Sequence, residues 1–83
     1  MNNYAQKSNN ETESIITFDN YEKKVNVYST RNATIKKLIK QLGKPANISY
    51  INGQIFDAEW DIPFSDRVKI RKLLSINTYF LNK

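Results

Sequence analysis

The stretch Ile35-Lys36-Lys37-Leu38-Ile39 decides the predicted fold, because its order of apolar and basic residues recurs at Ile70-Arg71-Lys72-Leu73-Leu74. Apolar residues three and four positions apart lie on one face of a helix, so each copy predicts an amphipathic helix with basic residues on its outer side. Two segments in which apolar and polar residues alternate precede each copy, as is typical of a β-hairpin. The chain is therefore predicted to form two successive ββα units.

The repetition has two interpretations. It is either the trace of a duplication or the pattern that any two hairpin-plus-helix units share, and we weigh the second more heavily. Both interpretations predict the same order of elements along the chain.

The first unit begins at Ser14. Its hairpin contains no glycine for a tight turn, so a loop of about four residues over 21–24 is expected, with Phe18 opposite Val27. Thr30 has the side chain of a helix N-cap, and Gly43 is expected to end the helix.

The second hairpin has a stronger turn signal, Asn52-Gly53. A two-residue loop at that dipeptide would put Ile48 opposite Asp57, which conflicts with the alternation of the second strand. A three-residue loop over 51–53 would instead pair Ile48 with Phe56, and it is the predicted connection. Ser65 is predicted to cap the second helix.

The predicted fold class is α+β: two ββα units that form one four-stranded antiparallel sheet with both helices on one face. Residues 1–12 are polar and lack periodicity, so they are predicted to be a disordered tail before a single domain over 13–83. The segment 77–83 is too apolar for a free tail. It is expected to pack on the domain as a last helical turn or a short strand, or else to join a second copy.

Composition excludes several classes of chemistry. The 83 residues contain neither histidine nor cysteine, which removes the commonest metal ligand, the commonest general base and every thiolate mechanism. We expect no cofactor and no enzymatic activity. Because no apolar run is long enough to span a membrane and the first residues do not form a signal peptide, we expect a cytoplasmic protein without membrane contact.

The charged residues predict two candidate surfaces. The net charge of +5 comes mainly from the helices, whose outer faces form a candidate nucleic-acid interface. Its residues are Arg31, Lys36, Lys37, Lys40, Arg67, Arg71 and Lys72. Alternating acids on one strand form a candidate partner-binding face, together with a tyrosine on the preceding hairpin. Its residues are Tyr28, Asp57, Glu59 and Asp61.

The segments Glu13-Ser14-Ile15-Ile16-Thr17-Phe18 and Val25-Asn26-Val27-Tyr28-Ser29-Thr30, followed by Lys37-Leu38, resemble a group of short phage and prophage proteins. Those proteins open with Glu-Thr-x-Ile-x-Phe, continue to a Val-x-Tyr-Thr strand end and then enter a helix with Lys-Leu. The resemblance covers about residues 13–40, and the chain departs from it after Pro45. It implies a phage or another mobile element as the setting, and no specific activity.

Three functions are consistent with these observations. The first in weight is a non-enzymatic accessory protein that binds a host protein or ribonucleoprotein, in the manner of inhibitors of defence complexes such as anti-CRISPR proteins. The alternative is binding of DNA or RNA through the basic helix faces, although the chain contains no recognised nucleic-acid-binding motif. The third is an enzyme that holds Mg²⁺ on the three strand acids, and it has the least support because such acids usually protect and solubilise a strand. The oligomeric state is not predicted.

Overall fold

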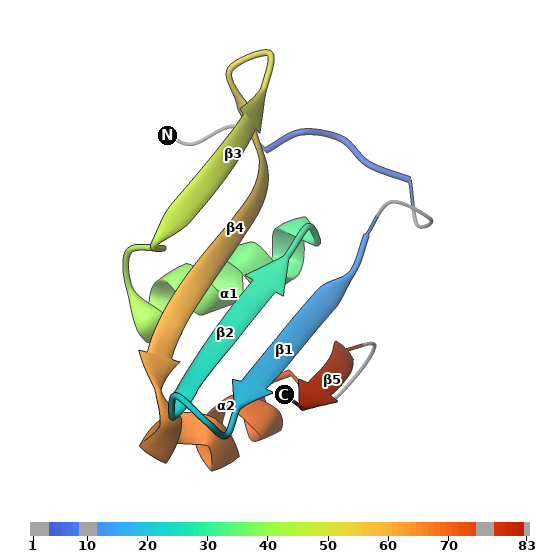
Figure 1. Cartoon of the computed structure of the whole chain (residues 1–83). Coiled ribbons are helices and arrows are strands. Elements are labelled where there is room, and N and C mark those ends of the chain that lie inside the picture. Colours follow the sequence, from blue (N-terminus) through green and yellow to red (C-terminus); the bar gives the residue numbers. More distant parts are fainter. Residues whose placement is uncertain (1–3, 9–11, 75–77, 83) are drawn as a thin grey trace.

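The computed structural model describes residues 4–8, 12–74 and 78–82. Its elements are β1 (Ser14–Asp19), β2 (Lys24–Ser29), α1 (Asn32–Leu42), β3 (Asn47–Ile51), β4 (Gln54–Pro63), the short 3₁₀ helix η2 (Phe64–Asp66), α2 (Arg67–Leu73) and β5 (Thr78–Asn82). The strands form one mixed sheet in the order β3-β4-β2-β1-β5, which confirms the α+β class. Figure 1 shows α1 behind the sheet, with α2 at one end.

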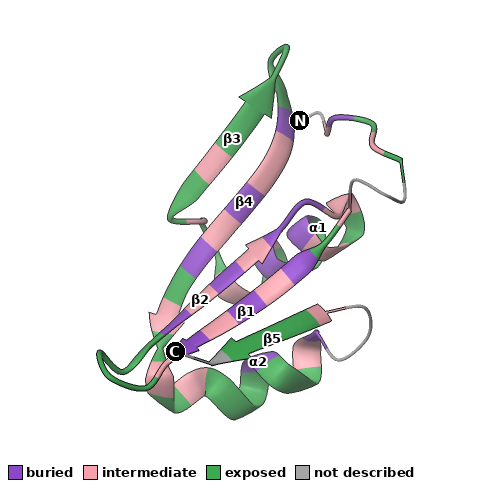
Figure 2. Ribbon diagram, turned by 45° about the vertical axis from the view of Figure 1, so that its right-hand side comes forward, coloured by how far each residue is buried: buried purple, intermediate pink, exposed green. Residues whose placement is uncertain are grey.

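One face of the sheet, here called the inner face, forms the core together with both helices. Alternate strand residues point to it, and Figure 2 shows their burial alternating along β1, β2 and β4. The buried core consists of Ile16, Phe18, Val25, Val27, Ile35, Leu38, Ile55, Ala58, Trp60, Ile70 and Leu74. Each large side chain buried in this way stabilises the fold by roughly 1.5–3 kcal/mol.

The fold differs from the predicted one by a fifth strand. β5 lies beside β1 and runs parallel to it, so the sheet has five strands and is mixed rather than four-stranded and antiparallel. Of the alternatives considered for the C-terminal segment, the structure shows the short strand. Period-2 patterning marks a strand but carries no information about its neighbour, which is why the pairing with β1 was missed.

The first hairpin has a four-residue connection, displaced by one position from the prediction. Asp19 pairs with Lys24, and Phe18 lies opposite Val25 rather than Val27. The carboxylate of Asp19 closes the turn by accepting hydrogen bonds from the backbone N–H groups of Tyr21 (3.1 Å) and Glu22 (2.9 Å). An aspartate side chain commonly accepts such hydrogen bonds from the backbone of the turn that follows it.

The second hairpin corrects the predicted three-residue loop. Ile51 pairs with Gln54, so the loop is Asn52-Gly53 alone, and both residues have the positive φ angles (52° and 78°) that a primed two-residue turn requires. A β-bulge between Ser49 and Tyr50 then shifts the register, which puts Ile48 opposite Ala58. The register conflict seen in the sequence was real, but a bulge resolves it rather than a longer loop.

Gly43 ends α1 as predicted, but the two predicted N-caps are corrected. α1 begins at Asn32 with Arg31 at the N-cap and no side-chain cap. Thr30 instead accepts a hydrogen bond at its Oγ1 from the backbone N–H of Glu13 (2.8 Å), which ties the end of β2 to the start of β1. Ser65 lies within η2, and α2 likewise lacks a side-chain cap.

Residues 4–8 fall within the predicted tail, yet the structure places them against the domain. β4 extends beyond the end of β2, and this segment lies along the edge that β2 leaves open. The backbone N–H of Ala5 donates to the carbonyl of Ile55 (2.8 Å), and Asn32 Nδ2 donates to the carbonyl of Ala5 (3.0 Å). Lys7 Nζ donates to the carbonyls of Thr30 and Phe56. Hydrogen bonds to β4, to α1 and to Thr30 between β2 and α1 thus hold this short segment against the domain.

Candidate functional site

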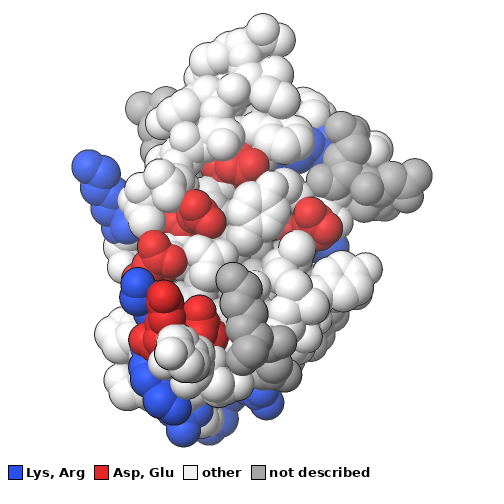
Figure 3. Space-filling model, viewed as in Figure 1, with Lys and Arg blue, Asp and Glu red and all other residues white. Residues whose placement is uncertain are grey.

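The second face of the sheet, here called the outer face, is not covered by a helix. α1 and α2 both contribute to the core of the inner face, which leaves the outer side chains of β1, β2 and β4 without a second layer among the described elements. Figure 3 views this face and shows acidic side chains gathered on it, with basic side chains toward its lower end and edges. An open sheet face of this kind is a candidate contact surface.

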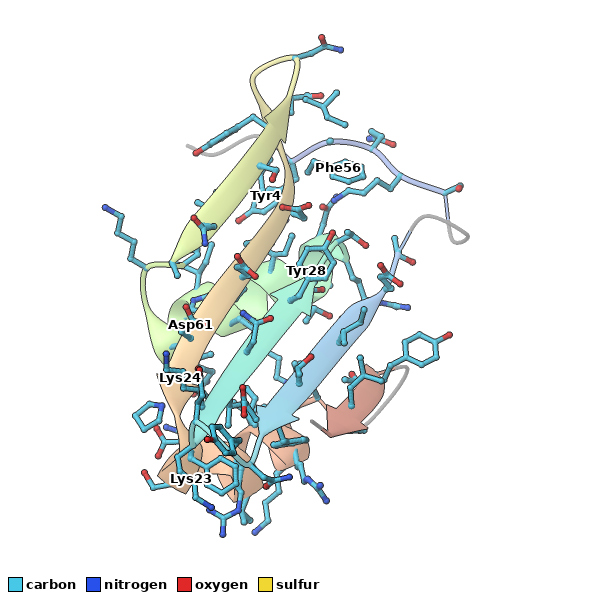
Figure 4. The ribbon with its side chains drawn as sticks, in the orientation of Figure 1. Tyr4, Lys23, Lys24, Tyr28, Phe56 and Asp61 are labelled. Carbon is cyan, nitrogen blue, oxygen red and sulfur yellow. The ribbon has the colours of Figure 1, made fainter. Side chains whose placement is uncertain are left out.

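Asp57, Glu59 and Asp61, here called the acidic row, follow one another on the outer face of β4. Successive members are about 6.6–6.8 Å apart along a strand, because every second residue faces the same side. The row lies beside β2, where Tyr28 pairs with Glu59 and Asn26 pairs with Asp61. Figure 4 shows Tyr28 and Asp61 on these neighbouring strands. The structure therefore brings together the predicted partner-binding residues.

Tyr28 forms the polar centre of this face. Its hydroxyl donates to Asp57 Oδ2 at 3.0 Å. Burial raises the pKa of the Tyr28 hydroxyl to about 12, and the hydrogen bond to Asp57 and the negative charges of Asp57, Glu13 and Glu59 act in the same direction. A tyrosinate would be repelled by these carboxylates, so Tyr28 stays neutral and acts as a donor at physiological pH.

Neutral amides hold the other two acids of the row. Asn26 Nδ2 donates to Glu59 Oε2 and to Asp61 Oδ1, both at 3.1 Å, and Asn47 Nδ2 donates to Glu59 Oε1 at 2.8 Å. These donors orient the carboxylates without neutralising them. The row is thus an ordered line of negative charge. Binding a partner therefore costs less side-chain entropy than it would if the carboxylates were mobile.

The predicted basic residues lie on or near the helices, and several make contacts within the molecule. Lys37 Nζ donates to the carbonyl of Leu73 (2.8 Å) and so joins α1 to the last turn of α2. Arg67 donates to the carbonyl of Phe64 (3.0 Å) and covers its ring. The guanidinium of Arg71 lies 4.7 Å from the ring centre of Phe18.

The remaining basic residues are spread more widely. Lys36 lies over the ring of Tyr4, 4.9 Å from its centre. Lys40 in α1 and Lys72 in α2 are exposed. Arg31 is half-buried and lines a cavity of about 360 Å³ at the start of β5. The seven residues therefore form no single compact cluster, although Lys37 joins the two helices that carry most of them.

Sequence reasoning missed the polar partners of the acidic row. The alternation of the strand marks Asn26 only as a polar position, and no sequence pattern singles out Asn47. The signal for both was the register, because a donor on a neighbouring strand reaches an acid only when the two residues lie opposite each other. The shifted register of the first hairpin does not affect this, since the pairing of β2 with β4 places Asn26 at Asp61.

The outer face gives little support to a metal site. Among the described residues, no three carboxylates come together where they could hold a metal ion, because the acidic row is spread along β4.

No helix in the described part of the chain has the length and hydropathy needed to cross a membrane. Comparison of the chain with family models, with curated proteins and with solved structures found no match.

Proposed function

We propose that this protein is a non-enzymatic binding module and that the outer face receives a cationic surface of a host protein or ribonucleoprotein. One observation carries the proposal: Tyr28 and the acidic row share a single open sheet face, where neutral donors hold the carboxylates in place. A line of oriented negative charge selects partners with complementary positive charge and accelerates their encounter.

The spacing of the row narrows the class of partner. Carboxylates that recur along an extended strand fit a series of Lys or Arg side chains, and such series occur where proteins bind the nucleic-acid backbone. A host site of that type is the target expected of an inhibitor that competes with nucleic acid. The further assignment to a phage or another mobile element, and to inhibition of a defence complex, rests on the resemblance of residues 13–40 and on this charge arrangement together.

The test uses a triple variant that removes the charge of the row and keeps its shape, Asp57→Asn with Glu59→Gln and Asp61→Asn. Wild type and variant are immobilised and exposed to nuclease-treated lysate of a candidate host, and bound proteins are identified by mass spectrometry. We expect a basic protein that the wild type retains and the variant loses. The control is Asp19→Asn with Glu22→Gln, which removes two acids, one at the end of β1 and one in the β1–β2 loop.

The proposal fails if the control variant loses the same protein, or if the triple variant retains everything that the wild type binds. A partner found in this way is then purified, and its affinity is measured against salt concentration. Affinity for a charged face is expected to fall steeply as salt rises.

The second candidate function is binding of DNA or RNA through the helices. The observation in its favour is the bond from Lys37 to the carbonyl of Leu73, which holds the basic residues of α1 and α2 on adjoining surfaces. Here Lys36→Glu with Lys40→Glu would abolish binding of a labelled duplex or single strand, whereas the neutralised acidic row would strengthen it. Unchanged binding in the lysine variant would exclude this function.

A further inference from the structure

β5 is an edge strand whose second edge is open. It lies at the end of the strand order, paired on one side with β1, and no other described strand borders it. Its side chains remain accessible: 64% of Tyr79, 38% of Phe80 and 52% of Leu81 is exposed. Figure 2 shows the middle of β5 as exposed, in contrast with the purple and pink pattern of β1 beside it.

The two edges of the sheet differ in their pairing. At the opposite edge, the register between β3 and β4 shifts between Ser49 and Tyr50, where the extra residue, Phe56, belongs to β4. β5 pairs with β1 in continuous register from Thr78 to Asn82 and contains neither proline nor a charged residue. The backbone N–H and C=O groups of residues 79–82 that point away from β1 border no other described strand, so they present a template for another strand.

Two arginines lie close to β5. Arg71 of α2 reaches the inner side of β5, where its guanidinium lies 5.6 Å from the ring centre of Phe80 and 4.7 Å from that of Phe18. The two rings stack with 6.2 Å between their centres. At the start of β5, Arg31 lines the 360 Å³ cavity together with Thr12, Thr78 and Tyr79. Each half of the strand thus has an arginine near it.

We propose that the open edge of β5 binds an extended acidic segment of a partner protein as a sixth strand. Carboxylates at alternate positions of that segment lie on the inner side, where they meet Arg31 in the cavity and Arg71 beside Phe80. The intervening apolar side chains lie on the outer side against Tyr79 and Leu81. Backbone hydrogen bonds along the edge then supply affinity, and the alternating pattern supplies selectivity.

Charge favours this occupant over a second copy of the chain. Two copies joined through β5 would bring Arg71 of each toward the other, in molecules that each carry a net charge of +5. An acidic strand removes this repulsion and pairs both arginines. The proposal goes beyond the proposed function, because it concerns an edge and a set of residues that the acidic row does not share.

The test is titration of the full chain with a labelled short peptide in which Glu alternates with Val, followed by fluorescence anisotropy. We expect saturable binding, and at least about tenfold weaker binding to Arg31→Gln with Arg71→Gln. The control, Lys44→Gln with Lys69→Gln, removes the same charge from the loop before β3 and from an exposed position of α2, and it should bind as the wild type does. Circular dichroism verifies that each variant is folded, and Arg31→Gln alone serves if the double variant is not.

Hydrogen exchange then locates the peptide. Slower exchange of β5 amides in the complex supports a sixth strand at that edge, whereas slower exchange confined to β3 overturns the proposal. Equal binding of a peptide in which Lys replaces Glu also overturns it, as does an equal loss of affinity in the control. Sedimentation that shows a dimer dissociated by Tyr79→Lys would assign the edge to a second copy and would likewise overturn it.

Discussion

The same strands form both faces of the sheet, but the inner face packs in the core and the outer face is a candidate contact surface. In β1, Ile16 and Phe18 point inward and are almost completely buried, whereas Ile15 and Thr17 point outward and remain partly accessible. In β4, Trp60 lies in the core while Glu59 and Asp61 lie outside. The comparison teaches that adjacent residues carry separate tasks: inward positions determine whether the chain folds, and outward positions determine what it contacts.

The largest difference between the faces is expected for two adjacent residues of β1. Ile16→Ala removes a fully buried side chain and leaves a cavity, which should lower the free energy of unfolding by about 2–5 kcal/mol. Thr17→Ala, on the outer face, should change it by about 0.5 kcal/mol or less. Urea unfolding of both variants measures the difference. Equal losses would mean that a further layer covers the outer face.

A smaller effect is expected at the polar centre of the outer face. Tyr28→Phe removes the hydroxyl that donates to Asp57 and should cost about 1 kcal/mol, the usual net contribution of one hydrogen bond. Tyr21→Phe is the control, because Tyr21 is 93% exposed. If both variants unfold at the same urea concentration, the bond to Asp57 contributes no stability.

The same tyrosine predicts a dependence on alkaline pH. The pKa of Tyr28 is about 12 in the folded chain against 10.0 for an ordinary tyrosine, so the folded state holds this proton more tightly. Its contribution to stability is complete below pH 10 and is lost as the pH rises toward about 12. Thermal unfolding across this range should show a steeper decline for the wild type than for Tyr28→Phe. Parallel curves would contradict the raised pKa.

The smallest effect on stability is expected at the exposed end of the acidic row. Asp61→Asn keeps the shape of the side chain and reduces repulsion from Glu59, so the free energy of unfolding should stay within about 0.5 kcal/mol. Affinity for a cationic partner should nevertheless fall, because the charge is lost from the contact surface. If Asp61→Asn lowers the free energy of unfolding by more than this and leaves the affinity unchanged, Asp61 contributes to folding and not to binding.

Alternation and helical periodicity were enough to predict β1 to β4, both helices and the side of the sheet on which the helices lie. They were not enough for register. In the second hairpin, the sequence showed that Ile48 and Asp57 should not be opposite each other, but a longer loop and a bulge both satisfy that condition. The choice depends on whether Asn52 adopts a positive φ, which asparagine tolerates better than most residues.

Pairing between strands that are far apart in the sequence was the second feature that local patterns could not predict. The position of β5 beside β1 depends on the fit of Phe80 against Phe18 and Arg71, residues that local patterns do not connect. The packing of Tyr4 was missed for a similar reason, since one aromatic residue in a polar segment has no period. Tyr4 pairs with Ile55 in the part of β4 that extends beyond the end of β2, and sequence patterns do not reveal this unpaired edge.

The acidic row was predicted because it lies on a single strand, where spacing alone places the carboxylates on one face. The basic set was less predictable, since helical position does not reveal which cations already contact the chain itself. Lys37, Arg67 and Arg71 all do so, through carbonyls or aromatic rings. A count of charges therefore overestimates the basic surface that a partner would meet.

The parallel pairing of β1 with β5 also has a consequence for how the chain folds during synthesis. β1 is synthesised well before β5, so Ser14 has no strand partner on that side until Thr78 has left the ribosome. Contacts between residues so far apart in sequence form slowly, because closing the intervening chain costs entropy before the contact repays it. In the nascent chain β1 is an unprotected edge, and this interval is when mispairing with another chain is most probable.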